Sequence, residues 1–341
     1  MMNRTGIIRL LVDFFRRESI RQVIILTDEN VEKHYSDYFS ELTGWVSVDK
    51  VVLPAGEQAK SMETTVSVWS RFVDRQYDKG VLLLNFGGGV ICDIGGFVAS
   101  TYKRGIRFVN FPTTLLAMID ASVGGKNGVN VHHVKNAVGT FYFPDIQLPV
   151  DLKLLETLPK EELKSGFGEL VKYALIGSEK LFNDLDALPD LNSLKEEHIG
   201  FCIDFKRKIV QKDPNDAGLR HILNYGHTIG HAIESYSSEA GTPMSHGLAV
   251  AQGLYYESLL SAKLGRLPKE EWEHIDRFLK KQFDIMPITD KFLEKLTPYM
   301  LNDKKNRNNL VNFTLIDHIG HADPDFQIAL DTLARAICPL Q

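Results

Sequence analysis

The sequence predicts an α/β domain with a Rossmann-like nucleotide-binding fold, followed by a mainly α-helical domain. In the first part of the chain, short apolar runs alternate with segments of helical spacing, which is typical of a parallel sheet covered by helices. From about residue 155 onward, nearly every apolar pattern has helical spacing. We therefore expect an α/β domain at residues 1–153 and a mainly helical domain at residues 154–341.

The elements follow from these patterns in chain order. Strands are expected at residues 22–28 (QVIILTD), 81–86 (VLLLNF) and 108–114 (FVNFPTT), because each is apolar and rich in branched or aromatic residues. Helices are expected at residues 61–76, at the apolar segment after 89, and at 155–177, around 202–213, 226–236, 246–265 and 268–283. Residues 311–320 (VNFTLIDHIG) are expected to form a late strand or hairpin.

Composition excludes several classes of function. The chain has 341 residues and a net charge of −5, so it has no bulk positive field for nucleic acid or an anionic membrane. No apolar run approaches the roughly 20 residues of a membrane helix. Arg4, Arg9 and Asp13 interrupt the N-terminal apolar segment, which argues against a signal peptide. Three widely spaced cysteines fit a reducing cytoplasm and form no CxxC metal motif.

A glycine-rich turn follows the second expected strand, in LLLNFGGGVICDIGG. Glycines at this place allow backbone N–H groups to approach a diphosphate at the start of a helix. The spacing is not G-x-G-x-x-G, so Gly87, Gly88 and Gly89 form either a nucleotide site or only a tight turn. Asp93 lies one turn into the helix and either binds a cofactor hydroxyl or amide, or compensates the helix dipole.

Several basic residues share segments with Asn, Glu or His, which indicates an anionic substrate. Lys126 is expected where a strand exits into a loop, and Lys172 follows Glu169 by three residues on one helix face. The others are Lys135, Lys206, Arg220, Lys304 and Lys305. Because most lysines in proteins are solvated surface residues, none of these identifies a site alone.

Histidines in NYGHTIGHAIE indicate a metal site. His227 and His231 are four residues apart, as in the zincin motif H-E-x-x-H, but Thr228 replaces the glutamate of that motif. His246 opens the following helix, and Glu169 lies in an apolar helix where its carboxylate needs a partner. A catalytic zinc takes three protein ligands, so these residues form either a metal centre or a set of satisfied core and surface residues.

The ordered motifs together resemble the 3-dehydroquinate synthase family over residues from about 25 to 316. They are PAGEQAKS, GGGVICDIGGFVASTYKRGI, FPTTLLAMIDASVGGKNG, VKNAVG, SGFGELVKYALI, LRHILNYGHTIGHAIE, SHGLAVAQG and NDKKN. The resemblance implies an active site between the two domains, a tightly bound NAD and one zinc or cobalt ion. It implies conversion of 3-deoxy-D-arabino-heptulosonate 7-phosphate to 3-dehydroquinate by transient NAD oxidation, β-elimination of phosphate, reduction and intramolecular aldol closure.

Residue roles carry over by matching position. The implied metal ligands are Glu169, His227 and His246. The residues implied to line NAD are Asp28, Asn30, Glu57, Lys60, Gly88, Gly89, Val90, Asp93, Thr113, Thr114, Lys126, Lys135 and Thr157. Those implied to contact substrate or act in catalysis are Asp120, Lys126, Lys135, Asn136, Lys172, Lys206, Arg220, Asn224, His231 and Lys304 or Lys305. Arg104 is implied to reach the substrate phosphate of a neighbouring subunit, which makes the protein a homodimer.

One departure and two alternatives accompany the resemblance. The family commonly has HGEAV where this chain has HGLAV, but Leu248 is not at a ligand position. Related sugar-phosphate cyclases share the fold and the metal ligands, and Lys206, Arg220 and Asn224 favour the dehydroquinate reaction over theirs. A metal-dependent polyol dehydrogenase is the second alternative, but its neutral substrates leave the basic residues unexplained. With three ligands already present, His231 is expected to form hydrogen bonds or transfer protons beside the substrate.

Overall fold

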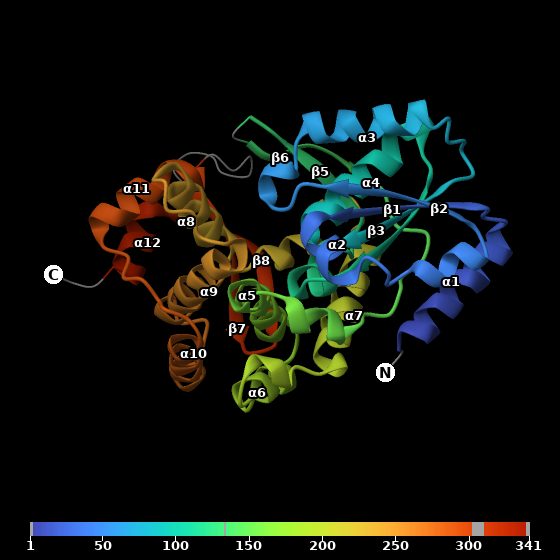
Figure 1. The fold of residues 1–341 in the computed structure, drawn as a ribbon. Helices are drawn as coiled ribbons and strands as arrows, with labels where there is room; N and C mark the ends of the chain where they lie inside the picture. Colours follow the sequence, from blue (N-terminus) through green and yellow to red (C-terminus); the bar gives the residue numbers. More distant parts are fainter. Residues whose placement is uncertain (1–2, 133, 302–309, 339–341) are drawn as a thin grey trace. The chain divides into compact units, whose positions relative to one another are not determined.

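The computed structural model describes residues 3–132, 134–301 and 310–338 of the chain (Figure 1). It divides into two compact units, Met1–Pro159 and Lys160–Gln341. The division falls at Pro159, whereas the sequence placed the domain boundary at residue 153.

A parallel sheet with the strand order β2-β1-β3-β4 is the centre of the first unit (Figure 1). The strands are β1 (Gln22–Asp28), β2 (Ser47–Leu53), β3 (Leu82–Gly87) and β4 (Arg107–Pro112). The three predicted strands are confirmed. The edge strand β2 was missed because its sequence, SVDKVVL, is polar in its first half and only partly buried.

Helices and aromatic rings cover the two faces of this sheet. The helices are α1 (Arg4–Glu18), α2 (Glu29–Tyr35), α3 (Met62–Asp74) and α4 (Gly89–Thr101). Because side chains alternate along a strand, Leu83 faces a core formed with α3 and α4, while Phe86 points to the other face. There Phe86 packs on Tyr38 and Phe39, with ring centroids 5.4 and 5.0 Å away.

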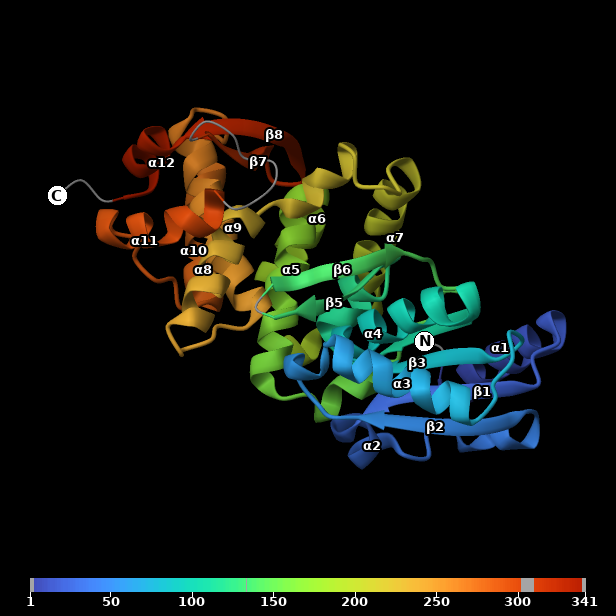
Figure 2. The same cartoon turned by 90° about the horizontal axis from the view of Figure 1, so that it is seen from above.

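A hairpin of β5 (Lys126–Val131) and β6 (Val134–Phe141) lies beside α4 (Figure 2). Glycines allow α4 to approach its neighbours. A Cβ on Gly95 would come within 1.8 Å of the Asn85 Oδ1 on β3, and one on Gly96 within 1.8 Å of the Asn127 Oδ1 on β5. The two glycines therefore fix how deeply α4 sits between the sheet and the hairpin.

The second unit is mainly helical, as predicted, with one antiparallel hairpin. Its helices are α5 (Lys160–Gly177), α6 (Glu179–Asp186), α7 (Glu196–Lys212), α8 (His227–Glu239), α9 (His246–Lys263), α10 (Lys269–Gln282), α11 (Asp290–Leu301) and α12 (Leu330–Ile337). The hairpin consists of β7 (Leu310–His318) and β8 (His321–Ala329), which confirms the late strand or hairpin. The predicted helix from residue 155 begins only at Lys160, because a proline at 159 disfavours helical backbone in the residue before it.

Helices α5, α8 and α9 approach one another at glycines. A Cβ on Gly168 of α5 would lie 2.1 Å from the carbonyl oxygen of Gly247 on α9. A Cβ on Gly253 of α9 would lie 1.8 Å from the carbonyl oxygen of Gly226, the residue before α8. The backbone of α9 is therefore in direct contact with α5 and with the start of α8, and the first turn of α9 meets the middle of α5.

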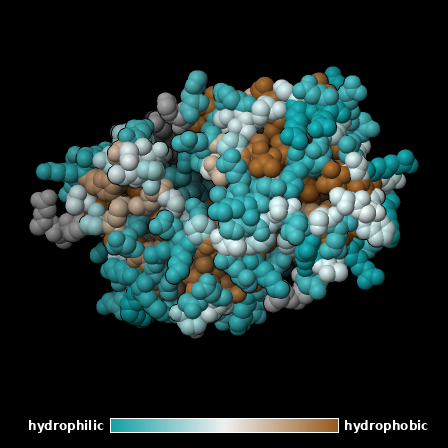
Figure 3. Space-filling model, in the orientation of Figure 1, coloured by the Kyte–Doolittle hydropathy of each residue, from teal (hydrophilic) through white to brown (hydrophobic). Residues whose placement is uncertain are grey.

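The face drawn in Figure 3 is largely hydrophilic, with apolar patches between hydrophilic side chains. Among the described residues, no helix has both the length and the apolar character needed to cross a membrane.

The packing of α4 makes Gly95→Ala a test of the first unit. The added methyl overlaps Asn85, so we expect the free energy of unfolding to fall by about 1–3 kcal/mol, although alanine is the better helix former. Urea denaturation followed by tryptophan fluorescence measures it. Gly44→Ala is the control, because a Cβ there has nothing within 4 Å. An equal effect of both changes would show that the contact with Asn85 has no energetic weight.

Candidate functional site

One carboxylate and two imidazoles meet where α5, α8 and α9 touch. The Oε1 of Glu169 lies 3.4 Å from the Nε2 of His227 and 3.1 Å from the Nε2 of His246. Glu169 lies within α5, and the two histidines are the first residues of α8 and α9. The glycine contacts between these helices bring the three side chains together.

The other ring nitrogen of each histidine is engaged by a second acceptor. The Nδ1 of His227 lies 3.1 Å from the carbonyl oxygen of Tyr225, and the Nδ1 of His246 lies 3.2 Å from the Oε2 of Glu234. Donation from Nδ1 leaves the Nε2 lone pairs directed at the Glu169 oxygen. Three acceptors that converge in this way fit a bound cation, and the Nδ1 partners fix the ring orientation that a metal requires.

Charge around Glu169 supports the same interpretation. Its side chain is fully buried, and its Oε2 lies 2.5 Å from the Nζ of Lys172 without hydrogen-bond geometry to any described residue. Burial acts to raise the pKa of Glu169, but Lys172 and the two histidines hold it well below its usual value. Burial lowers the pKa of His227 well below its usual value. Glu169 is therefore a carboxylate beside a neutral imidazole, as metal ligands are.

His246 differs from His227 in its electrostatics. Burial acts to lower its pKa, but hydrogen bonds to Glu169 and Glu234 raise it to about 10. The two carboxylates therefore favour positive charge at this ring. A divalent cation at Nε2 would supply that charge in place of a proton.

His231 brings a third imidazole to this centre. One ring nitrogen from each of His227, His231 and His246 lies within 4.8 Å of the others, and the rings of His227 and His231 are 4.9 Å apart. His231 is exposed, in contrast to the buried Glu169. The geometry by itself allows either residue to complete a three-ligand set with the two other histidines.

A second group of possible ligands lies at the turn of the β7–β8 hairpin. The Oδ1 of Asp317 is 2.9 Å from the Nδ1 of His318 and 2.8 Å from the Nδ1 of His321. The two rings are within 6° of parallel, and both are about half exposed. Because Asp317 holds both rings at the turn, and exposed groups of this kind are common without an ion, we assign this group to the stability of the turn.

Three buried basic residues lie in the same unit as this centre, and Lys172 contacts it directly. Lys172 on α5, Lys206 on α7 and Arg220 on the turn Leu219–Asn224 (η7) are each at most 7% exposed. These three segments pack on one another, and Asn224 ends the turn, half-buried. Three buried basic side chains on segments that pack on one another bring concentrated positive charge to this unit, and such charge suits an anionic ligand. The expected substrate residues Lys304 and Lys305 lie outside the described residues.

In the first unit, the residues expected at NAD follow the ends of the parallel strands. Asp28 ends β1, Gly88 follows β3, and Thr113 follows β4. Glu57 and Lys60 lie in the turn after β2. Because the carboxyl ends of parallel strands share one edge of the sheet, these residues gather at that edge, where nucleotides bind in such folds.

The start of α4 is suited to a diphosphate. Gly88 is the N-cap residue, and no side chain caps the first turn, so the backbone N–H groups that follow are open to an anion. Val90 belongs to this first turn, and Gly89 begins it. A Cβ on Gly88 would lie 3.0 Å from the methyl group of Thr114, so the glycine keeps the two loops close.

Several of these side chains already hold the loops in place. Asp28 accepts hydrogen bonds from the backbone N–H groups of Asn30 and Val31, and thus caps α2. Lys60 forms an ion pair with Asp93. These charged side chains are therefore held in place before any cofactor binds.

The remaining expected residues are spread over the first unit. Lys126 begins β5 and does not follow a strand, so the expectation of a strand-to-loop exit was wrong. The four-stranded sheet ends with β4, and the glycines before Lys126 turn the chain into the hairpin instead. Lys135 and Asn136 are exposed on β6, Asp120 lies in the helical turn Ala117–Ala121, and Thr157 lies 2.9 Å from the hydroxyl of Tyr35.

Arg104 is exposed on the turn Tyr102–Arg104. Lys103 and Arg104 have φ angles of 48° and 63°, in the left-handed region that non-glycine residues avoid. Two consecutive strained residues at an exposed turn indicate a constraint beyond folding.

Sequence reasoning missed residues that support the site. The fully buried Glu257 on α9 accepts hydrogen bonds from the N–H groups of Gly226 at 2.7 Å and Ile229 at 3.1 Å, and so holds the first turn of α8. Eleven residues separate it from His246, about three helical turns, so both lie on one face of α9. That spacing was a usable signal. No sequence signal pointed to Asn130. Its side-chain amide donates to Glu57 at 2.8 Å and joins the hairpin to the loop after β2.

Comparisons with known proteins agree with these features. Residues 50–165 match the model of the 3-dehydroquinate synthase N-terminal domain, and residues 166–306 match that of the C-terminal domain. A 3-dehydroquinate synthase of Parabacteroides distasonis is 36% identical over 317 residues, covering 91% of this chain and 88% of the relative.

Two solved structures share the whole fold. A 2-deoxy-scyllo-inosose synthase complexed with carbaglucose-6-phosphate, NAD+ and Co2+ is 25% identical, with a TM-score of 0.84 and coverage of 97% of this chain and 94% of that one. The 2-epi-5-epi-valiolone synthase of Streptomyces hygroscopicus subsp. jinggangensis, with NAD+ and Zn2+ bound, is 26% identical, with a TM-score of 0.83 and coverage of 96% and 93%.

Glu257→Gln tests the support of α8 through its pH dependence. Burial raises the pKa of Glu257 to about 8, against the lowering effect of the backbone N–H groups. A folded-state pKa above the unfolded one means that folding binds a proton. Its contribution to stability is therefore complete below about pH 4.5 and is lost as the pH rises toward about 8, by on the order of 1 kcal/mol per pH unit.

Because glutamine does not titrate, we expect the stability difference between the parent protein and Glu257→Gln to shrink over that range. Urea denaturation at a series of pH values, with a chelator present, measures it. His227 and His246 titrate in both proteins, so their contributions cancel. Glu270→Gln, an exposed glutamate in the first turn of α10, should leave the pH profile unchanged. A pH-independent effect of Glu257→Gln would contradict the expectation.

Proposed function

Because the chain belongs to the 3-dehydroquinate synthase family, we propose that it converts 3-deoxy-D-arabino-heptulosonate 7-phosphate to 3-dehydroquinate and phosphate, in the shikimate pathway. The observation that carries the proposal is the centre formed by Glu169, His227 and His246, next to buried basic residues. A cation centre on α5, α8 and α9, together with buried basic residues on α5, α7 and η7, suits a substrate with both hydroxyl and phosphate groups.

We propose Glu169, His227 and His246 as the ligands of one zinc or cobalt ion. Imidazole and carboxylate ligands suit these metals, and the Nδ1 contacts orient both rings. The edge of the parallel sheet, with the uncapped start of α4, would hold the diphosphate of NAD. When bound, the metal would acidify a substrate hydroxyl and NAD would accept and return a hydride.

The chain's own residues would bind and orient the substrate. Arg220, with its planar guanidinium, suits a carboxylate or phosphate in two-point contact, and Lys206 and Lys172 would add point charges. His231, exposed and beside His227, would accept or return a proton. Asn224 would donate to or accept from substrate hydroxyls. Positive charge fixed before the substrate arrives stabilises the anionic groups without reorganisation.

Other sugar-phosphate cyclases are the second candidate function, since two of them share the fold. The higher identity to a curated 3-dehydroquinate synthase, 36% compared with 25% and 26%, favours the dehydroquinate reaction. A polyol dehydrogenase, the third candidate, needs no buried Lys206 or Arg220.

We propose that the protein acts as a homodimer in the cytoplasm. Arg104 would reach the substrate phosphate of the neighbouring subunit, and its exposed, strained turn suits that role. Val134, Val138 and Phe141 expose 61, 42 and 49% of their surface on β6, and exposed apolar side chains of this kind suit a contact between subunits. The cysteines that the structure describes are all free thiols, as in a reducing compartment.

Phosphate release tests the proposed reaction. With heptulosonate phosphate, NAD and zinc, we expect release of one phosphate per substrate, no net NADH, and loss of activity after chelation. Absorbance at the NADH band and a phosphate assay measure both products. Stoichiometric NADH would indicate a polyol dehydrogenase. Phosphate release from a hexose phosphate alone would indicate another cyclase.

Glu169→Gln tests the ligand set separately from activity. The change keeps the side-chain shape but removes the charge that neutralises the metal, so we expect zinc affinity to fall by tenfold or more. Isothermal titration with zinc measures it. Glu161→Gln, an exposed glutamate on the same helix, should bind zinc like the parent protein. His231→Gln should also bind zinc like the parent protein. The opposite result, in which Glu169→Gln binds zinc tightly and His231→Gln does not, would show that His231 is the third ligand.

A further inference from the structure

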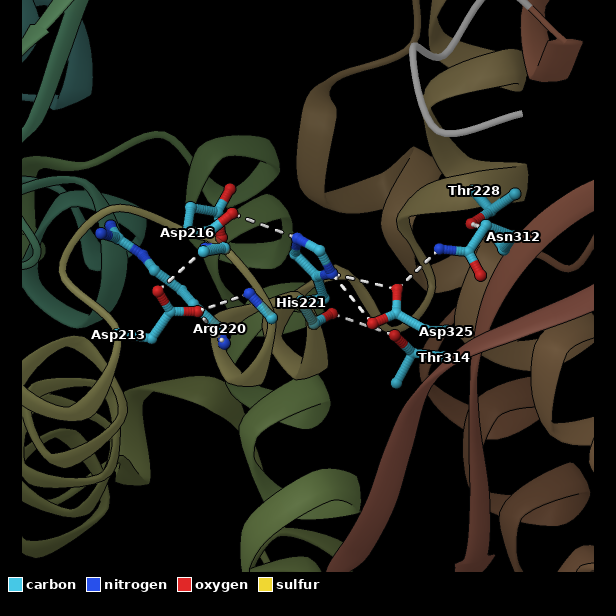
Figure 4. Close-up of polar contacts among 10 residues, drawn as sticks. Asp213, Asp216, Arg220, His221, Thr228, Asn312, Thr314 and Asp325 are labelled. Atoms are coloured by element: carbon cyan, nitrogen blue, oxygen red, sulfur yellow. Dashed lines mark hydrogen bonds and ion pairs between the residues drawn. The ribbon is translucent and has the colours of Figure 1, made fainter. Parts of the chain in front are cut away.

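An imidazole that no proposed role uses lies at the centre of a polar network in the second unit (Figure 4). His221 follows Arg220 in the turn η7. Its Nδ1 lies 3.0 and 3.1 Å from the two carboxylate oxygens of Asp325 on β8, and its Nε2 lies 3.2 Å from the carbonyl oxygen of Asp216. Both partners are acceptors, so either ring nitrogen that carries a proton has an acceptor for it.

The backbone is distorted on both sides of this ring. Asp325 and Asp216 have φ angles of 68° and 58°, in the left-handed region. The β7–β8 register also shifts here, because Phe313 pairs with Phe326 but Leu315 pairs with Asp323. The extra residue on β8 is a β-bulge at Asp325, a feature that redirects a side chain. Asp325 is about half exposed, so its pair with His221 adds little stability, and stability alone does not explain the distortion.

The same hairpin holds both segments that carry the proposed active-site residues. The hydroxyl of Thr314 donates to the carbonyl oxygen of His221 at 3.0 Å, within η7. The amide of Asn312 donates to Asp325 at 2.7 Å, and the carbonyl oxygen of Asn312 accepts from the hydroxyl of Thr228, the second residue of α8, at 3.0 Å. The hairpin therefore connects η7 with the helix that begins at His227 (Figure 4).

The opposite end of the turn is fixed from α7. Asp213, directly after α7, accepts from the N–H groups of Ala217, Gly218 and Arg220 at 2.8, 2.8 and 3.0 Å. Its carboxylate fixes where the turn begins. Asp325 and Thr314 fix its middle, at His221. The backbone of Arg220 lies between these two attachments.

We propose that Asp325, acting through His221, is a positioning residue that fixes the η7 turn and so directs Arg220 and Asn224 toward the anionic substrate. The proposal rests on the proposed function for the identity of that substrate. The fixation of η7 itself follows from the contacts of the hairpin.

Asp325→Gly gives a sharp test. Glycine adopts the left-handed backbone without strain and removes the carboxylate, so a purely structural role of this position predicts little loss of function. We expect instead that KM for heptulosonate phosphate rises by about tenfold or more, because a small misplacement of a substrate-binding group has effects of this size. KM for NAD and zinc stoichiometry should not change. Asp325→Asn keeps an acceptor oxygen, so its KM for heptulosonate phosphate should lie between those of Asp325→Gly and the parent protein.

Asp323→Asn is the matched control. Asp323 lies on the same strand, is also about half exposed, and pairs with Arg266 at 2.8 Å instead of with η7. It should keep the parent KM, and Asp325→Gly should melt no lower than this control. In a protein that already carries Arg220→Met, Asp325→Gly should raise KM for heptulosonate phosphate by a much smaller factor than in the parent protein. Both changes act on the same substrate-binding group, so their effects are not additive.

Amide hydrogen exchange separates this proposal from the proposed function. The backbone amides of Leu219–Asn224 should exchange about tenfold faster in Asp325→Gly than in Asp323→Asn, whether or not the protein releases phosphate. If the parent protein releases no phosphate, the proposed function fails and exchange alone decides on the fixation of η7. Unchanged exchange in Asp325→Gly, or an unchanged KM in an active enzyme, would overturn the role of Asp325.

Discussion

The second unit depends on direct backbone contact between α5, α8 and α9. Ordinary helices pack 8–10 Å apart, with side chains between them. Here Gly168 and Gly253 leave no room for a side chain, so α9 touches α5 and the start of α8 through backbone atoms. The positive ends of the α8 and α9 dipoles then meet at the carboxylate of Glu169, which is stabilised as an anion there. Side-chain rearrangement cannot adjust these backbone contacts, so the fold fixes where the backbones of Glu169, His227 and His246 lie.

The sequence predicts the elements whose signals are local. Strands β1, β3 and β4 are continuous apolar runs, and the helices that begin at His227 and His246 have clear periodicity with glycine or serine before the first turn. The convergence of the expected NAD residues at one sheet edge follows from parallel topology alone. The sequence also shows the charge of Glu169 within an otherwise apolar helix, and this indicated a partner before the structure identified one.

The rest depends on contacts between residues far apart in the chain. The pairing of Glu257 with the first turn of α8, and of Asp325 with His221, joins segments separated by 28 to 104 residues. No local pattern encodes such pairs. The hairpin β5–β6 was also missed, because its glycines and exposed polar residues lack the alternation of a half-buried strand. The bulge at Asp325 arises from a register shift between two strands, which composition does not reveal.

The ion pair of Glu169 with Lys172 determines whether this part of the fold can form without a bound metal ion. The carboxylate has a counter-charge one helical turn away on its own helix, 2.5 Å from Oε2. An uncompensated carboxylate in a protein interior is strongly unfavourable, whereas this one pairs with Lys172, three residues further along the same helix. The fold therefore does not need the divalent ion in order to form, in contrast to small zinc domains that are unfolded without it. A divalent ion bound at the proposed centre would then be able to exchange in the native protein.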